Sequence, residues 1–190
     1  MKCKENLELH IFKHHNHLFM NDRIVNETKD VYLTRDVKVR GGGSSNVKAL
    51  QTFSTQQLNS QTIDLLIKWI SSFLIIPKKH ERDDTKIDFH YAITDFWIAK
   101  YNKGDHTVEH SHEPAAYSFV YFVKSPTGSS PLIFTTSDTK IEPEEGTVVI
   151  FPGNLKHHVP TNNCDGRIVF AGNIYAMFYR DKRSGDTFIK

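Results

Sequence analysis

The sequence predicts an all-β sandwich or barrel that is buttressed by one helix. From residue 89 onward, short segments rich in β-branched and aromatic residues recur at regular spacing. Pairs of turn-forming residues separate several of these segments, namely Glu145-Gly146, Pro152-Gly153 and Asp165-Gly166. Before residue 89, one segment carries apolar residues at helical spacing. Many short strands that follow a single helix are typical of a β-sandwich or barrel with a helix packed on it.

The predicted helix covers residues 56–74. Its apolar residues recur mostly at intervals of one, three and four, which places them on one face: Leu58, Ile63, Leu66, Ile67, Ile70 and Leu74. Pro77 ends the helix because proline cannot continue it. Upstream, the segment IFKHHNHLFM (11–20) is a weak candidate for an outer strand. The segment Gly41–Ser45 is either a plain loop or a mobile loop near a site.

Five strands are predicted after the helix. Each is a run of aromatic, β-branched or other apolar residues: Phe89–Tyr101, Tyr117–Val123, Leu132–Thr135, Thr147–Phe151 and Arg167–Tyr175. Turn-forming residues over 102–105 and 125–128 close the first two strands. The turn over Asn102–Thr107 is a second candidate for a lid, with an ordered surface loop as the alternative.

A chain of 190 residues is predicted to form one domain, 1–190. We divide it into an N-terminal extension, 1–88, a β-rich core, 89–176, and a C-terminal tail, 177–190. A chain of this length buries roughly 70% of its unfolded surface, so its core is large enough to fold without disulfides or structural metals. The hydrophobic fraction of 38% is that of a globular protein.

Composition excludes several classes of protein. The net charge of +2, from 24 basic and 22 acidic residues, excludes a polyelectrolyte and gives little support for nucleic-acid binding. A local basic patch at Lys78, Lys79 and Arg82 stays possible. Two cysteines, Cys3 and Cys164, exclude a disulfide scaffold. Because no apolar run approaches the roughly 20 residues of a membrane span, and the start has no apolar signal segment, we expect a cytoplasmic protein with no membrane partner.

Histidine is over-represented, with 11 residues against 10 glycines. His110 and His112 are two apart in a strand-like stretch that follows the turn at 102–105. On a strand their imidazoles would point to one face and could bind one metal ion. A third ligand could return on another strand at His157, 45 residues later (157 − 112), or at His158. Neighbouring residues on a strand face opposite ways, so only one of this pair can be a ligand. The alternative is a chance H-x-H in a histidine-rich chain.

The other histidines are predicted to lie outside a metal site. His106 and His158 are candidates for the mouth of the site or for the surface. The remaining ones are expected to be surface or packing residues: His10, His14, His15, His17, His80 and His90.

Arg167 opens the last predicted strand, directly after an Asp-Gly turn. An arginine buried there beside the third histidine would need an anion, because its planar guanidinium binds carboxylates in a bidentate manner. The alternative is an exposed arginine at the strand edge that pairs with Asp165 or with a glutamate.

Three segments together resemble the 2-oxoglutarate/Fe(II)-dependent oxygenases. They are FWIAKYNKGDHTVEHSHEPAAYSFVYFV (96–123), EEGTVVIFPGNLKHHVP (144–160) and GRIVFAGNIY (166–175). The sequence looks most like small bacterial and phage members that have an H-x-H motif, and its layout is similar to that of the prolyl hydroxylases. The resemblance implies a mainly β fold, the double-stranded β-helix (jelly roll, cupin-like), with one or more buttressing helices.

The resemblance also implies roles for individual residues. His110, His112 and His157 match the Fe(II) ligands, His157 because it begins the H-x-V frame at 157–159. Arg167 matches the arginine that pairs with the distal carboxylate of 2-oxoglutarate. Tyr101 matches a tyrosine that often contacts the cosubstrate. Tyr121 and Asn173 are weaker matches, with a place in the core or in the pocket wall as the alternatives. Four phenylalanines are candidates for the apolar wall of the pocket, with core packing as the alternative: Phe119, Phe122, Phe134 and Phe151.

One residue departs from the family pattern. The usual ligand set is two histidines and one carboxylate, and His112 stands where the carboxylate is expected. Glu109 and Glu113 flank the pair, but strand alternation puts them on the opposite face. We therefore expect a three-histidine site.

The implied activity is that of a hydroxylase. Fe(II), O2 and 2-oxoglutarate would yield succinate and an oxidised C–H bond, with ascorbate as a possible reductant. A protein prolyl residue, a modified nucleobase and a small metabolite are all open as substrates, and the sequence carries no indication of oligomeric state. Two alternatives remain: a cupin-like three-histidine dioxygenase that does not use 2-oxoglutarate, and a non-enzymatic jelly-roll module for binding or structure.

Overall fold

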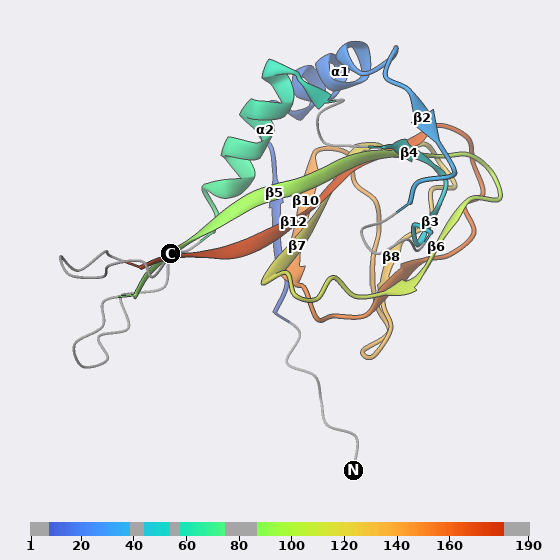
Figure 1. Ribbon diagram of the computed structural model, residues 1–190. Coiled ribbons are helices and arrows are strands. Elements are labelled where there is room, and N and C mark those ends of the chain that lie inside the picture. The colour runs from blue at the N-terminus through green and yellow to red at the C-terminus, as the bar shows by residue number, and fades with distance from the viewer. Residues whose placement is uncertain (1–7, 39–43, 54–57, 75–86, 181–190) are drawn as a thin grey trace.

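In the part of the chain that the structure describes, the strands form two antiparallel sheets, and two helices cover the outer side of the larger sheet (Figure 1). The structure is a computed structural model that describes residues 8–38, 44–53, 58–74 and 87–180. Lys78, Lys79, Arg82 and most of the predicted loop at 41–45 lie outside these ranges. Among the described helices, none is long and apolar enough to cross a membrane.

The larger sheet has seven strands. Their spatial order is β1 (His10–Lys13), β10 (Thr147–Pro152), β7 (Tyr117–Lys124), β12 (Arg167–Arg180), β5 (Ile87–Tyr101), β4 (Leu50–Thr52) and β2 (Leu33–Thr34). The smaller sheet has five strands, in the order β3 (Val47–Lys48), β6 (His106–His110), β11 (His157–Val159), β8 (Leu132–Phe134) and β9 (Thr139–Ile141).

From β5 onward the chain passes back and forth between the sheets, with β5, β7, β10 and β12 in one and β6, β8, β9 and β11 in the other. This winding is the double-stranded β-helix, so the predicted fold class is confirmed. The N-terminal region adds strands to both sheets, and the first of them, β1, pairs with β10 through His10 and Ile150. β12 continues to Arg180, so the first residues of the predicted tail belong to a strand.

The helices are α1 (His17–Glu27) and α2 (Gln61–Ser71). α2 corresponds to the predicted helix. It begins after Ser60, whose hydroxyl accepts a hydrogen bond from the amide of Ile63 at 3.2 Å, as an N-cap residue does. α1 was not predicted, because within it only Asn21 and Ile24 are buried and the apolar pattern is correspondingly weak.

Two apolar cores result from strand alternation. One lies between the helices and the larger sheet and contains Ile63, Ile70, Phe119 and Tyr121. The other lies between the two sheets and contains the phenylalanines 122, 134 and 151. The second core supports the histidines of the predicted site, since the Phe151 ring lies 4.8 Å from that of His157.

Candidate metal centre and anion pocket

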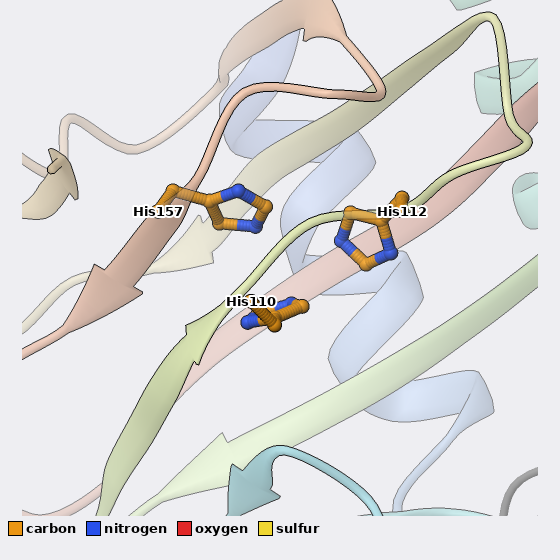
Figure 2. A group of neighbouring side chains, drawn as sticks. All are labelled: His110, His112 and His157. Carbon is orange, nitrogen blue, oxygen red and sulfur yellow. The ribbon is translucent and has the colours of Figure 1, made fainter. Parts of the chain in front are cut away.

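His110, His112 and His157 come together between the two sheets and point toward one another (Figure 2). One nitrogen from each ring lies within 4.8 Å of the other two. The centroid of the His110 ring lies 4.4 Å from the centroid of the His157 ring and 4.7 Å from that of the His112 ring. Three imidazole nitrogens at this separation can bind one first-row divalent metal ion such as iron or zinc.

The backbone fixes the position of each histidine. His110 ends β6 and His157 begins β11, and the two are directly paired in the antiparallel register. His112 lies two residues beyond the end of β6, where its amide donates a hydrogen bond to the carbonyl of Gly153 at 2.7 Å. The loop packs so closely there that a Cβ on Gly153 would lie 2.2 Å from the carbonyl oxygen of Ala115. Only glycine therefore fits at position 153.

Hydrogen bonds also select the tautomer of two rings. Nδ1 of His110 lies 2.7 Å from the carbonyl oxygen of Val108, and Nδ1 of His157 lies 2.9 Å from that of Leu155. A carbonyl can only accept, so both Nδ1 atoms carry the proton. Each Nε2 then keeps a free lone pair, which is the arrangement of a metal-binding histidine held by its outer hydrogen bond.

Burial keeps the cluster neutral. Desolvation, together with the neighbouring imidazoles, lowers the pKa of His112 to about 3 and that of His157 to about 4. Burial also lowers the pKa of His110. Because all three rings are therefore unprotonated near neutral pH, their lone pairs are available to a metal ion.

Arg167 lies in the same pocket, and two of its three guanidinium nitrogens lack a hydrogen-bond partner. Its side chain is 1% exposed, and neither Nε nor Nη1 donates a hydrogen bond within the described residues. The guanidinium lies 4.5 Å above the ring of Tyr101, and burial lowers the pKa of Arg167. A buried cation with two unused donors fits a carboxylate ligand, whose charge and acceptors would satisfy both. The compound 2-oxoglutarate has such a carboxylate at each end.

Tyr101 lines the pocket, as expected from the sequence, whereas Tyr121 does not. Tyr101 is 3% exposed, lines the pocket, and shares a hydrogen bond of 2.7 Å with the hydroxyl of Thr107. The hydroxyl of Tyr121 instead donates to Oδ1 of Asn21 on α1, on the helix-covered side of the sheet. The prediction that Tyr121 binds cosubstrate is wrong, because alternation along β7 turns its side chain away from the pocket.

The remaining predicted residues take mixed positions. Asn173 faces the inter-sheet side but is hydrogen-bonded to Ser118 and Asp95 rather than to pocket residues. His106 is exposed, and the ring of His158 lies 3.3 Å from the hydroxyl of Thr135 on the side away from the cluster. Of the four predicted wall residues, Phe119 lines the pocket, although it also packs in the helix-side core. Phe122, Phe134 and Phe151 belong to the inter-sheet core behind the pocket.

Sequence reasoning missed two pocket residues. Trp97 lines the pocket, with its ring 6.0 Å from that of His112. Thr107 lines it as well. Trp97 could have been found by parity, since it is four residues before Tyr101 on the same strand face. Thr107 could not, because it is three residues before His110 and the pairing of β6 with β11 shifts register between these two positions.

No protein-family model matches this sequence, and no curated protein sequence matches it. The fold, however, is that of known 2-oxoglutarate oxygenases. The viral collagen prolyl hydroxylase vCPH from Paramecium Bursaria Chlorella virus-1, solved as a 2OG complex, superposes with a TM-score of 0.60 at 19% identity, over 87% of this chain and 94% of that one.

Two further structures have the same fold. An oxidoreductase of the 2OG-Fe(II) oxygenase family from Burkholderia pseudomallei gives a TM-score of 0.61 at 11% identity, covering 92% of this chain and 88% of its own. A prolyl hydroxylase from Trichoplax adhaerens, in complex with a hypoxia inducible factor peptide fragment, gives 0.56 at 12% identity, covering 87% and 82%. At these identities the similarity shows the fold.

Proposed function

We propose that this protein is a 2-oxoglutarate- and Fe(II)-dependent oxygenase that hydroxylates a C–H bond. One observation carries the proposal: three neutral histidines and a buried arginine with two unused donor nitrogens line the same pocket between the sheets. Neither half alone would be enough, because a metal cluster could be structural and a buried arginine could bind any anion. Together they match the two ends of a 2-oxoglutarate chelate.

Each residue has a defined part in this function. His110, His112 and His157 would hold Fe(II) through one nitrogen each. Arg167 binds the distal carboxylate, and the Tyr101 ring beneath the guanidinium limits the directions from which it can be approached. When bound, iron and 2-oxoglutarate supply the oxidation, in which O2 is consumed and succinate, CO2 and a hydroxylated substrate are formed.

The surrounding side chains keep water away from the site. Val47, Leu132, Val159 and Val169 line the pocket and are each less than 9% exposed. A dry pocket strengthens the interaction between Arg167 and a carboxylate, since the local dielectric is low. It also protects reactive species from side reactions with water.

A peptide is the substrate class that the comparisons favour. The viral neighbour is a collagen prolyl hydroxylase, and the Trichoplax neighbour was solved with a peptide fragment. A nucleobase or a small metabolite is less consistent with these neighbours. We therefore propose a side chain of a peptide or protein as the site of oxidation.

A three-histidine dioxygenase that does not use 2-oxoglutarate is the second candidate, and His112 in the carboxylate position favours it. This candidate gives Arg167 no task, whereas its unused donors require an anion. A non-enzymatic metal-binding module would likewise leave Arg167 unexplained.

Succinate formation tests the proposal. Protein purified without oxygen is loaded with Fe(II) and supplied with 2-oxoglutarate, O2 and ascorbate, and succinate is measured by mass spectrometry. We expect slow turnover without substrate, and its loss in His110→Ala and in Arg167→Ala. Succinate formation that survives both substitutions would contradict the proposal, and oxidation of a substrate without any consumption of 2-oxoglutarate would favour the second candidate.

A further inference from the structure

Three polar side chains form a row across neighbouring strands of the larger sheet. Asn173 on β12 pairs in register with Asp95 on β5 and with Ser118 on β7. Its Nδ2 donates to Oδ2 of Asp95 at 2.9 Å, and its Oδ1 accepts from the Ser118 hydroxyl at 3.0 Å. Asn173 and Ser118 are buried, at 7% and 1% exposure, whereas Asp95 is exposed. The buried pair therefore orients an accessible carboxylate.

The row lies beyond the metal cluster, on the side away from Arg167. Along β12 the residues on the inner face run from Arg167 to Asn173, a span of about 20 Å at the rise of a strand. On β5, Asp95 is one inner-face position past Trp97, about 7 Å further along the strand. Because the Trp97 ring is 6.0 Å from that of His112, the histidines lie between the arginine and the row.

Asp95 carries a charge that no described residue neutralises. Among the described residues its side chain forms one hydrogen bond, which it accepts from Asn173, and no Lys, Arg or His forms an ion pair with it, so Oδ1 is available. Inside the pocket, on the other side of the histidines, the unused donors of Arg167 point to a bound ligand. A substrate that reaches the metal from the row therefore meets this carboxylate first.

We propose that Asp95, oriented by Asn173, binds a positively charged nitrogen of the substrate and thereby selects cationic substrates. This inference rests on the proposed oxygenase function and names a substrate class for it: a molecule with an ammonium or guanidinium group several bonds from the carbon that is oxidised. An opposite charge near a pocket mouth gives specificity and steers association. The residue acts as a specificity determinant, because it lies outside the set of residues that line the pocket of the histidines.

The test is a charge-swap binding measurement on the full chain loaded with Zn²⁺ and 2-oxoglutarate. One probe is a five-residue alanine peptide with a central lysine, and the matched probe has that lysine Nε-acetylated. By calorimetry we expect the cationic peptide to bind about fivefold more tightly, which is the size of one exposed ion pair. Asp95→Asn should reduce the ratio to about one, and Asp95→Glu should restore part of it.

Asp138→Asn serves as the control, since it removes one exposed carboxylate from the turn between β8 and β9. It should leave the ratio unchanged. An equal affinity for both peptides in the unmodified protein, undetectable binding of both, or a ratio unaffected by Asp95→Asn would each overturn the proposal. A third probe, Nα-acetyl-lysine amide, separates the sources of the charge: binding as tight as that of the peptide indicates a small amine, and weaker binding indicates a peptide side chain.

The proposed oxygenase function is tested by a separate measurement. Succinate formation by the Fe(II)-loaded unmodified protein decides that function, whereas the ratio of affinities for the two peptides decides the role of Asp95. A protein that forms no succinate but discriminates between the peptides would keep the charge recognition and lose the oxygenase assignment. The reverse result would keep the oxygenase and exclude Asp95 as its specificity determinant.

Discussion

His110 and His157 lie directly opposite each other on adjacent strands, with their ring centroids 4.4 Å apart. Two of the three candidate ligands are thus brought together by backbone pairing and by their own Nδ1 hydrogen bonds. The site is consequently organised before any metal binds. Such preorganisation reduces the entropy that metal binding would otherwise cost.

Replacing a ligand should abolish metal binding. We expect His157→Ala to lower the affinity for Fe(II) or Zn²⁺ by more than about 100-fold, since changes merely next to metal ligands already cost 10–100-fold. The control is His158→Ala, which removes the adjacent ring on the other side of β11. Metal content after dialysis, measured by mass spectrometry, checks both. Equal loss in the two variants would mean that β11 as a whole, rather than His157, is responsible.

Arg167→Met should weaken 2-oxoglutarate binding without weakening the fold. We expect the affinity for 2-oxoglutarate to fall about 100-fold, because a buried charge-assisted pair is lost. Without ligand, the free energy of unfolding should stay constant or rise, since methionine removes an unpaired buried cation. Calorimetric titration and urea unfolding measure the two effects. A marked loss of stability without ligand would show that Arg167 has a structural role.

The metal-free protein should lose stability as the pH falls from 7 to 5. Burial holds the pKa of His157 at about 4, below the value of about 6.5 in an unfolded chain, so the unfolded state binds the proton first. The contribution of the neutral His157 ring to the free energy of unfolding is complete above about pH 6.5 and is lost as the pH falls from about 6.5 to about 4. For His157, which is 3% exposed, the loss at pH 5 is about 2 kcal/mol.

Urea unfolding in the presence of a chelator measures this pH dependence. His157→Gln should flatten the profile by that amount, because glutamine does not titrate. An unchanged slope in the variant would assign the pH dependence to other groups.

Gly153→Ala should disturb His112 specifically. The added Cβ would meet the carbonyl of Ala115 at 2.2 Å, so the loop between β6 and β7 must shift. We expect a loss of about 1–3 kcal/mol in stability and weaker metal binding. The control is Asn154→Ala at the exposed neighbouring position, which should leave both properties unchanged. Thermal unfolding and metal titration give the comparison, and normal metal affinity in Gly153→Ala would show that His112 is dispensable.

The sequence predicted the metal cluster better than its surroundings. The spacing of two paired His110 with His112, although β6 ends at His110 and His112 follows it in the loop. The return after one buried strand left His157 and His158 both open, and the family resemblance selected His157. The prediction that Tyr121 lies in the pocket failed because β7 is apolar on both faces, and composition cannot show which face meets the pocket. The pairing of Asp95 with Asn173 joins residues 78 apart and depends on register, which the sequence does not encode locally.

The helices illustrate the same limit. α2 has a continuous apolar face and was predicted, although the structure begins it at Gln61 rather than at residue 56. α1 packs on the sheet mainly through Ile24 and the hydrogen bond from Tyr121 to Asn21. A helix held by so few buried side chains leaves almost no periodic pattern in the sequence.

The pairing of His10 with Ile150 has a consequence for biosynthesis. β1 leaves the ribosome about 140 residues before its partner β10, the separation of His10 from Ile150 (150 − 10). Contacts of such long sequence separation slow folding, because a large loop must close before they form. The nascent chain therefore carries β1 unpaired until β10 has been made, and this edge of the large sheet forms only afterwards.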